Sequence, residues 1–342
     1  MPPNQALSLD QEFPSSLLHH LENNKIRVAV LGCGMMGQEH ISYISGYPNL
    51  RIDFLCDPHE PSLAKACKVI RAFNTQKQEK DQDQDNELEF VRCDESNTET
   101  YAHAPQLFLD EDELMEYVHL IDLLVIASPN YLHTPSLLKW AQHDINILVE
   151  KPVAVSQAQL ELLHSLNETQ AARIWVAMEY RYIPAIAKLR QLLPHIGDIK
   201  MITIRENRYP FLTKIGDWNR DTHKTGDTLV EKCCHFWDLF RLLTGLEIDT
   251  TKLRSMVQRG LNYQDETNVR EHPIIDSAYV VLPFLDSPSA GAKHHHQTIG
   301  CLELCMYAEG SRHQEEIIVT GTKVSTTHGP DLCEHHGLIA QH

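Results

Sequence analysis

The apolar positions in the first half of the chain come in short continuous runs rather than in alternation. Three of these runs are residues 26–31, 121–127 and 145–149. A strand that is covered on both faces of a parallel sheet has this pattern. Segments of helical character separate the runs. This alternation predicts an α/β domain with a doubly wound parallel sheet of the Rossmann type.

A glycine-rich turn follows the first run, where Gly32, Gly34 and Gly37 lead into a segment that can continue as a helix. The first glycine of such a unit permits the tight turn, and the second lets the backbone approach a pyrophosphate. The third lets the helix pack on the strand, and the free N–H groups of the helix face the phosphates. A second strand, 51–56, ends at Asp57, where a carboxylate can accept hydrogen bonds from an adenosine ribose. We therefore expect a dinucleotide site; the alternative is a glycine-punctuated turn with a surface aspartate.

The pattern is interrupted between the second and the third strand. Residues 74–86 are highly charged, of low complexity and without apolar anchors. Such a segment cannot offset its ordering entropy, so we predict a disordered insertion there. Further strands are expected at 87–92 and 106–109, and helices at 61–73, 111–117 and 135–143.

After residue 152 the same rhythm continues briefly and then changes. The expected elements are helices at 157–167, 183–193 and 229–243, and strands at 174–178, 201–208, 278–282, 300–307 and 315–320. Strands separated by turns predict a second, mostly antiparallel sheet, with an open face available to a helix or a partner subunit. The expected organisation is a polar tail (1–24), a dinucleotide-binding domain (25–152), a second α/β domain (153–324) and an unassigned tail (325–342).

Composition narrows the partners and the compartment. A length of 342 residues suits about two domains, and the net charge of −17 argues against a nucleic acid or an anionic membrane. No apolar run approaches the ~20 residues that span a bilayer, and the first residues lack the features of a signal peptide. The nine cysteines are scattered without a paired CxxC pattern. We therefore expect reduced thiols, a cytoplasmic location and no zinc site.

Lys151 is the first candidate for chemistry. It follows the run 145–149 in the sequence Glu150-Lys151-Pro152, at the sheet edge where ligands bind in open α/β folds. A partly desolvated lysine there can donate a hydrogen bond to a substrate hydroxyl or carbonyl. The alternative is a solvated lysine at the start of a loop.

The second candidate is the segment 226–245. Glu231, His235 and Asp238 fall at i, i+4 and i+7, on one face of the expected helix. A histidine beside a carboxylate can move a proton to or from a hydroxyl. Two structural alternatives stay open, because Thr228 and Glu231 fit a capping box and His235 could be a core residue.

Other polar groups give weaker signals. The histidines 294–296 with His313 have no ligand spacing, so a polar loop is the preferred interpretation. Cys301 and Cys305 would point to one face of a strand, where we expect buried small residues. Trp218, with Asp217 and Arg220, could form a substrate wall, although loop residues of this kind are more often structural.

Taken in order, five motifs make the chain resemble the glucose–fructose oxidoreductase / inositol dehydrogenase / MocA (Gfo/Idh/MocA) family. They are AVLGCGMMGQEH, ASPNYLH, VEKPVA, EYRYIPA and LVEKCCHFWDLFRLLTG. The resemblance covers about residues 25–324. It implies a Rossmann domain, a C-terminal α/β domain with a large open sheet that often forms dimers or tetramers, and chemistry on sugars, inositols and related polyols.

The resemblance also implies roles for single residues. Lys151 matches the lysine that contacts the reacting oxygen, and His235 matches the catalytic histidine. Glu231 falls where many members carry aspartate, and Asp57 matches the acid that selects NAD, which makes NADP the less expected cofactor. The implied cofactor contacts are Gly32, Cys33, Gly34, Met35, Met36, Gly37, Asp57, Ser128, Asn130, His133, Glu150 and Lys151, and the implied substrate contacts are Lys151, Arg181, Trp218, Arg220, Glu231 and His235.

The expected activity is hydride transfer between nicotinamide and a secondary hydroxyl of a sugar, inositol or related polyol. His235 would take the hydroxyl proton while Lys151 holds the alkoxide. The alternatives are an NAD-using glycosidase on the same scaffold and a non-catalytic dinucleotide-binding regulator. A homodimer or homotetramer is expected. The tail looks short beside the family's closing strand and helix, so a shortened final region is a further expectation.

Overall fold

The chain forms two compact units, and each is described by itself. The computed structural model describes residues 25–79, 104–212, 214–260, 271–285, 298–308, 311, 313–323 and 337–341. The first unit consists of Met1–Ser128, Leu132–Glu150 and Leu163–Val176. The second consists of Pro129–Tyr131, Lys151–Leu162 and Ala177–His342. The chain therefore crosses between the units several times.

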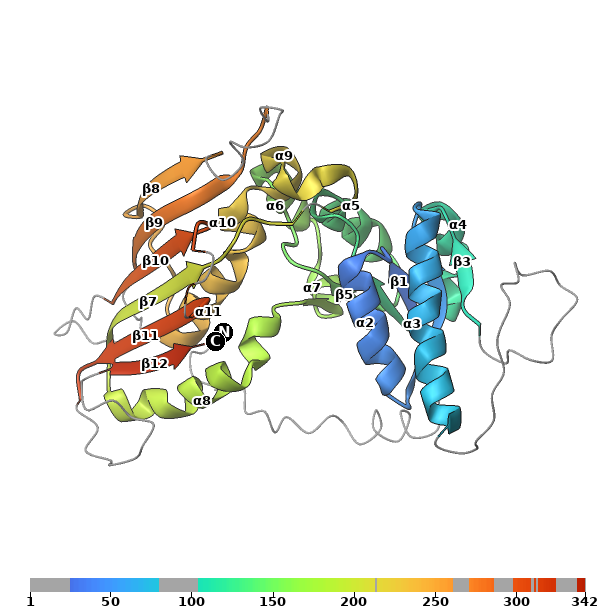
Figure 1. Ribbon diagram of the computed structural model, residues 1–342, viewed down its shortest axis with the longest axis horizontal. Coiled ribbons are helices and arrows are strands. Elements are labelled where there is room, and N and C mark those ends of the chain that lie inside the picture. The colour runs from blue at the N-terminus through green and yellow to red at the C-terminus, as the bar shows by residue number, and fades with distance from the viewer. Residues whose placement is uncertain are drawn as a thin grey trace, which may run out of the picture. The chain divides into compact units, whose positions relative to one another are not determined.

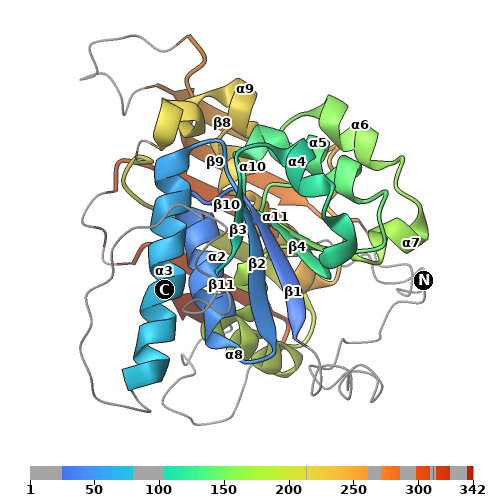
Figure 2. The same ribbon diagram turned by 90° about the vertical axis from the view of Figure 1, so that its right-hand side faces the viewer.

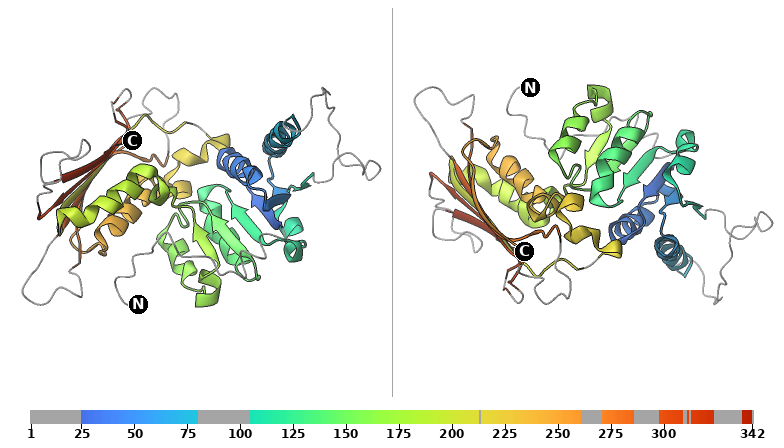
Figure 3. Two further views of the ribbon diagram at one scale, coloured as in Figure 1. Left: turned by 90° about the horizontal axis from the view of Figure 1, so that it is seen from below. Right: turned by 90° about the horizontal axis from the view of Figure 1, so that it is seen from above.

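The first unit is built on sheet A, a six-stranded parallel sheet with the order β3-β2-β1-β4-β5-β6. Its strands are β1 (Ile26–Leu31), β2 (Leu50–Cys56), β3 (Gln106–Phe108), β4 (Leu123–Ile126), β5 (Asn146–Val149) and β6 (Ile174–Val176). Helices α2 (Met35–Gly46) and α3 (Glu60–Glu79) cover one face, and α5 (Asn130–Trp140) covers the other (Figures 1, 2 and 3). The predicted doubly wound sheet is confirmed, and its continuous apolar strands are buried on both faces as expected.

Two expectations for the first unit need correction. Helix α3 continues to Glu79, so the first part of the predicted insertion at 74–86 is helical, and the rest lies outside the described residues with the strand predicted at 87–92. Strand β6 lies beyond the boundary predicted at residue 152, yet it pairs with β5. One cut at residue 152 therefore does not separate the two units.

The second unit is built on sheet B, with the order β12-β11-β7-β10-β9-β8. Its strands are β7 (Ile199–Asn207), β8 (Arg254–Arg259), β9 (Ile275–Pro283), β10 (Ile299–Cys305), β11 (Glu315–Gly321) and β12 (Gly337–Gln341). Among the described strand pairs of sheet B, only that of β7 and β10 is parallel, so the predicted mostly antiparallel sheet is confirmed. Helices α8 (Pro184–Leu192) and α11 (Cys234–Thr244) lie on one face of this sheet (Figures 1 and 3).

The core of the second unit lies between these helices and the sheet. Phe236, Leu239 and Phe240 of α11 are fully buried there against the alternate side chains of the central strands. The remaining helices are α4 (Glu111–Met115), α6 (Gln157–Leu163), α7 (Glu168–Ala171), α9 (Thr222–Thr225) and α10 (Thr228–Glu231), with the short 3-10 helices η1 (Val118–Leu120), η2 (Glu179–Tyr182), η3 (Leu193–Ile196) and η4 (Ile215–Arg220).

The opposite face of sheet B carries no helix of the described residues (Figure 3). Met201, Tyr279 and Val281 are 54%, 62% and 45% exposed and alternate with buried neighbours, as expected for a sheet with one open face. Arg205 on this face pairs with a carboxylate on each neighbouring strand, Glu303 and Glu316, both at 2.7 Å. The predicted open face is therefore present.

Cys301 and Cys305 share one face of β10, as predicted, but they are half-buried on the open side and do not join the core. The expectation that they are buried small residues is therefore wrong. Strands β8 and β12 were not predicted. β12 pairs with β11 through residues of the tail that we could not assign.

Candidate active site

The glycine turn has the geometry that its spacing predicts. Gly32 has a φ of 92°, and a β-carbon there would lie 2.5 Å from the Ser128 backbone nitrogen. A β-carbon on Gly37 would lie 1.9 Å from the Gly32 carbonyl oxygen, because α2 packs closely on the turn. Gly34, by contrast, has nothing within 4 Å of that position. The turn therefore leaves open space only at the glycine that is expected to face a pyrophosphate.

Asp57 holds this turn from the end of β2. Its Oδ2 accepts a hydrogen bond from the Cys33 backbone N–H at 2.7 Å, and its Oδ1 accepts one from the His59 N–H at 2.8 Å. The residue is only 9% exposed, so the alternative of a surface aspartate is wrong. The Cys33 thiol is also buried, and burial raises its pKa, so it is not a nucleophile at neutral pH.

The residues around the turn fit a dinucleotide such as NAD. Helix α2 begins after Gly34 without a side-chain cap, so its first N–H groups can donate hydrogen bonds to phosphate oxygens. Beyond β4, Ser128 Oγ is buried and has no hydrogen-bond partner among the described residues. Buried polar atoms are rarely left unsatisfied in a native protein. Ribose and phosphate groups would provide partners of the right kind.

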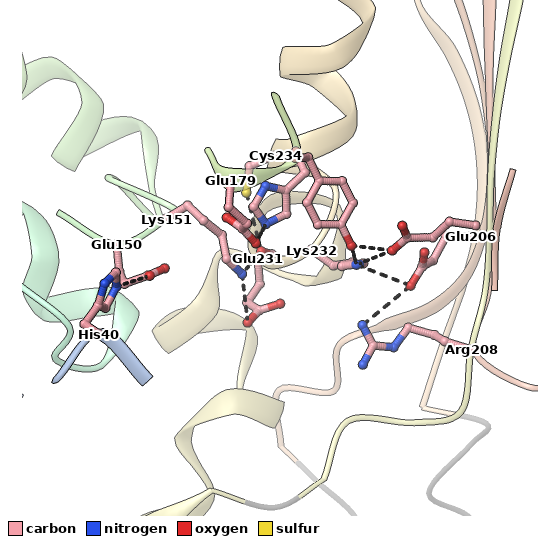
Figure 4. A network of polar contacts seen from close by, with 12 residues as sticks. His40, Glu150, Lys151, Glu179, Glu206, Arg208, Glu231, Lys232 and Cys234 are labelled. Carbon is pink, nitrogen blue, oxygen red and sulfur yellow. Dashed lines mark hydrogen bonds and ion pairs between the residues drawn. The ribbon is translucent and has the colours of Figure 1, made fainter. Parts of the chain in front are cut away.

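Two histidines fix the loops next to these groups. His133 is 1% exposed, and its Nε2 lies 2.8 Å from the Ser128 carbonyl oxygen. His40 on α2 lies 2.7 Å from Oε1 of the buried Glu150 (Figure 4). Glu150 is thus held within the first unit. His40 belongs to the motif AVLGCGMMGQEH, from which no role for this histidine was predicted.

Lys151 belongs to the second unit, where it meets Glu231. Its Nζ donates to the Glu231 backbone carbonyl at 3.2 Å and lies 3.8 Å from the Glu231 carboxylate (Figure 4). The lysine side chain is 15% exposed and that of Glu231 is 9% exposed. The two predicted catalytic residues are therefore adjacent and largely buried, and the alternative of a solvated lysine is wrong.

The helix predicted at 229–243 is broken, which changes the role of Glu231. Helix α10 ends at Glu231 and α11 begins at Cys234. The N-cap of α10 is Asp227, whose side chain accepts from the Thr228 N–H, so Thr228 lies inside the helix and donates its hydroxyl to the Ile275 carbonyl. The interpretation of Thr228 and Glu231 as a capping box is therefore wrong. The break also removes the common helix face on which Glu231, His235 and Asp238 were expected.

His235 lies in a largely closed environment. Its imidazole is 2% exposed and stacks on Tyr180, with the ring centroids 4.3 Å apart and the planes 11° apart. Nε2 lies 3.3 Å from the Glu179 carboxylate, and Nδ1 is buried without a hydrogen-bond partner in the described part of the chain. Burial, followed by the positive charges of Lys151 and Lys232, lowers the pKa of His235 to about 2. The imidazole is therefore neutral, and one of its ring nitrogens carries a lone pair.

The predicted substrate contacts are not all gathered with these residues. Arg181 forms a bidentate ion pair with Asp238. Arg220 donates to the Phe211 carbonyl at 2.9 Å, and Lys214 Nζ lies 4.8 Å from the centre of the Trp218 ring. Contact of Arg181, Trp218 and Arg220 with a substrate stays a prediction.

Sequence reasoning missed three residues around the imidazole: Glu179, Tyr180 and Lys232. Lys232 follows Glu231 directly, and its amine donates to the Tyr180 hydroxyl at 2.5 Å. Glu179 and Tyr180 lie in the motif EYRYIPA, which was recognised as a family motif without roles for these two. The presence of Tyr180 in this motif, next to Arg181, was the sequence signal that could have indicated a role for it.

Neither a metal site nor a membrane-spanning helix is found among the described residues. The described ranges contain no cluster of His, Cys, Asp and Glu that could hold a metal ion, and the histidines 294–296 lie outside them. In the part of the chain that the structure describes, no helix combines the length and the apolarity needed to cross a bilayer.

Comparison with known proteins identifies both units. The family described as "Oxidoreductase family, NAD-binding Rossmann fold" matches residues 26–178. The family described as "Oxidoreductase family, C-terminal alpha/beta domain" matches residues 190–337. Together the two matches cover most of the chain, in the order that the two sheets follow.

Similar single proteins act on sugars and inositols. The chain is 30% identical over 108 residues to scyllo-inositol 2-dehydrogenase (NADP(+)) IolU of Bacillus subtilis, which is 32% of each protein. It is 24% identical over 167 residues to glucose-6-phosphate 3-dehydrogenase of the same organism, which is 47% of each. The chain therefore spans less than half the length of these curated relatives.

A solved structure shows the same fold. The WlbA dehydrogenase from Bordetella pertussis, in complex with NADH and UDP-GlcNAcA, superposes with a TM-score of 0.62 at 17% identity. The match covers 87% of this chain and 76% of that one. At this identity the likeness concerns the fold alone.

Proposed function

The chain belongs to the Gfo/Idh/MocA oxidoreductase family, and we propose that it oxidises or forms a secondary hydroxyl of a sugar, inositol or related polyol with NAD. The observation that carries this proposal is the presence, within one unit, of a buried imidazole and a buried ammonium group, His235 and Lys151, close enough for the lysine charge to lower the pKa of the histidine. Relatives named for inositol and sugar dehydrogenation support the substrate class.

Each residue has a defined task in the oxidation direction. His235 accepts the proton of the substrate hydroxyl. Lys151 donates a hydrogen bond to the same oxygen and stabilises the negative charge that develops there. The cofactor, when bound, takes up the carbon-bound hydrogen with its electron pair. Glu231 holds the Lys151 amine through its backbone carbonyl and side chain, so that the charge stays in place.

Nδ1 is the imidazole nitrogen that can accept the proton of a substrate. Nε2 faces the Glu179 carboxylate at 3.3 Å and therefore carries the N–H of the neutral ring, whereas Nδ1 is buried and has no hydrogen-bond partner among the described residues. The Glu179 side chain is 56% exposed. The exposed carboxylate then provides a path for the proton from Nε2 to solvent.

The preferred cofactor is NAD rather than NADP. Asp57 keeps a buried carboxylate at the end of β2, beside the turn that would receive the pyrophosphate. A negative charge there accepts hydrogen bonds from ribose hydroxyls and repels a 2′-phosphate. In the same proposal Gly34, Met35 and Met36 offer the phosphates their N–H groups, and Ser128, Asn130, His133 and Glu150 line the nicotinamide end.

We also propose that the protein works as a homodimer or homotetramer in the cytoplasm. The open face of sheet B exposes Met201, Tyr279 and Val281, which a second copy would cover. Cys33, Cys56 and Cys233 are buried free thiols, in keeping with a reducing compartment.

A substrate screen tests the activity. The purified protein is mixed with NAD and a panel of inositols, aldoses and other polyols, and nicotinamide absorbance is followed; the screen is repeated with NADP. Reduction of NAD by at least one polyol is expected. Lys151→Ala should lower turnover by about a hundredfold while NAD still binds. Lys252→Ala is the matched control, because Lys252 lies in the same unit but is 66% exposed and pairs only with Asp249 among the ion pairs described.

The other outcomes each favour a different function. Release of a free sugar without a net change in absorbance would favour an NAD-using glycosidase. Binding of NAD without turnover of any polyol would favour a dinucleotide-binding regulator. Unchanged turnover in Lys151→Ala would show that the role assigned to this lysine is wrong.

A further inference from the structure

A group of charged side chains is buried beside His235, and the proposed reaction uses none of them. It consists of Tyr180, Glu206, Arg208, Lys232 and Glu315, which we call the Lys232 cluster (Figure 4). Its members come from η2, from β7 and its end, from the junction of α10 and α11, and from β11. Glu206 is completely buried and Lys232 is 7% exposed. Burying charges is costly, so such a group calls for an explanation.

Lys232 occupies the centre of the cluster. Its Nζ donates to the Tyr180 hydroxyl at 2.5 Å and to the Glu315 carboxylate at 2.9 Å, and it lies 3.6 Å from the Glu206 carboxylate. Tyr180 in turn donates its hydroxyl to Glu315. The phenol group is therefore held both as an acceptor and as a donor. Its position is fixed by two partners that are themselves bonded to each other.

The ring of Tyr180 connects this cluster to the imidazole. It stacks on His235 with the centroids 4.3 Å apart, and Lys232 Nζ lies 4.7 Å from the centroid of the same ring. The His235 nitrogens themselves make no hydrogen bond with the cluster. The Tyr180 ring therefore contacts both Lys232 and the imidazole, and the Phe236 ring packs against Lys232 and Tyr180, at 5.5 Å and 6.0 Å.

We propose that Lys232 is a positioning residue, which acts through Tyr180 to fix the plane of the His235 imidazole. That the imidazole takes part in catalysis rests on the proposed function; that Lys232 and Tyr180 position it does not. Two effects follow from one side chain. The hydrogen bond of Lys232 orients the stacked phenol, and its positive charge disfavours a second positive charge on the buried imidazole.

Charged groups of both signs lie near the imidazole. Burial first, and then the positive charges of Lys151 and Lys232, lower the pKa of His235. Burial raises the pKa of the neighbouring Cys234 thiol to about 12. Burial also raises the pKa of Glu206, although Lys232 and Arg208 oppose that shift. The carboxylates that contact these groups are those of Glu179, Glu231 and Glu315.

Proton NMR of the imidazole measures the positioning directly, without a substrate. The protein is labelled on histidine, and the His235 signals are assigned by their loss in His235→Gln. A ring stacked on tyrosine carries an upfield ring-current shift, and Tyr180→Leu gives the value without stacking. Tyr180→Phe keeps the aromatic ring but removes both hydrogen bonds to the cluster. We expect Tyr180→Phe, and Lys232→Met combined with Glu315→Gln, to lose most of the upfield shift.

A matched control lies on the same sheet. Arg205→Met combined with Glu316→Gln also removes a cation and a carboxylate from an ion-pair group of β7, β10 and β11, but on the open face. It should keep the wild-type shift. If Tyr180→Phe keeps the full upfield shift, Lys232 does not position the imidazole and the proposal is overturned. This variant decides the matter even if the Lys232 double variant fails to fold.

The charge effect and the catalytic effect have separate measurements. The protonation constant of His235, followed by the same signals in an acid titration, should rise about tenfold or more in Lys232→Met, which removes the cation alone, and stay unchanged in the Arg205 control. On a polyol found by the screen, the Lys232 variant should lose about tenfold in kcat with little change in KM, and Lys232→Arg should restore most of it. A screen without any substrate would refute the function but leave the NMR result standing.

Discussion

At the scale of single residues, each of the three glycines in the turn is needed for a different physical reason. Gly32 supplies a positive φ, Gly37 permits a close approach of α2 to the turn, and Gly34 leaves space for a ligand. Only the third reason concerns binding. Substitutions at these positions should therefore separate folding from cofactor binding.

Gly37→Ala should damage the fold, and Gly34→Ala should damage binding. A methyl group on Gly37 would lie 1.9 Å from a backbone oxygen, so the helix must move, at a cost of about 3 kcal/mol in the free energy of unfolding. A methyl group on Gly34 meets nothing within 4 Å, so stability should stay close to wild type while NAD affinity falls. Urea unfolding and calorimetric titration with NAD measure the two effects. Equal unfolding midpoints for both variants would contradict the close packing.

His235 should make the fold sensitive to acid. Its pKa is lowered to about 2 in the folded protein, whereas an unfolded chain protonates histidine near pH 6.5. Between these values the unfolded state binds more protons, so stability falls as the pH drops below about 6.5, by up to about 1.4 kcal/mol per pH unit. His235→Gln lacks this dependence and should lose less stability than wild type between pH 8 and pH 5. Urea unfolding at both pH values measures it, with the exposed His195→Gln as a control that should behave like wild type.

At the scale of elements, the break between α10 and α11 organises the site. Asp227 begins α10 with a φ of 86°, and its Oδ1 accepts from the N–H groups of Thr228 and Ile275. Its Oδ2 pairs with Arg259. One buried carboxylate thus joins the helix start to β8 and β9. The break that follows turns Glu231 toward Lys151 and leaves His235 in the first turn of α11.

Asp227→Ala should cost about 2–3 kcal/mol of stability, because it leaves two buried N–H groups and a cation without their acceptor. Asp221→Ala provides the comparison, since Asp221 caps the neighbouring α9 through His223 N–H in a more exposed position. That change should cost about 1 kcal/mol. Thermal unfolding of both variants tests the difference. Similar losses would mean that the bonds of Asp227 to β8 and β9 add little.

The elements also show where sequence patterns succeed. The parallel strands were predictable because burial on both faces leaves apolar runs, and α11 was predictable from its apolar stripe. Strand β8 was missed because all its residues are exposed, so no alternation marks it. The end of α3 was missed because charged residues such as Lys77 and Glu79 are good helix formers as well as typical loop residues.

The site was predictable only in part. Lys151 and His235 could be located from their motifs, and the structure brings them into one unit. The surroundings of His235 could not be predicted, since Tyr180 is far away in sequence, and Glu315, which accepts from the Tyr180 hydroxyl, is placed beside Glu206 only by the pairing of β11 with β7. The break after Glu231 was equally hidden, because its cause is the contact of Asp227 with strands that come later in the chain.

At the scale of the whole molecule, cofactor binding should couple to the stability of the first unit. A ligand that binds only the folded state at a hundred times its Kd adds about 2.7 kcal/mol. NAD should therefore raise the unfolding temperature more than NADP does. Asp57→Asn keeps an acceptor oxygen but loses the charge, so the difference between the unfolding temperatures with NAD and with NADP should become smaller. Asp53→Asn is the control, because Asp53 lies on the same strand and pairs with Arg51; it should leave that temperature difference unchanged. A larger shift with NADP in the wild type would contradict the choice of NAD.

The path of the chain has a practical consequence for recombining this protein with its relatives. Glu150 is anchored to the first unit by His40, and the next residue, Lys151, is anchored to the second by Glu231. Residues 163–176 then return to the first unit. A chimera with one crossover after Val176 would inherit Lys151 from one parent and Glu231 from the other. Exchange of specificity between relatives should therefore transplant residues 151–162 together with the segment that begins at Ala177.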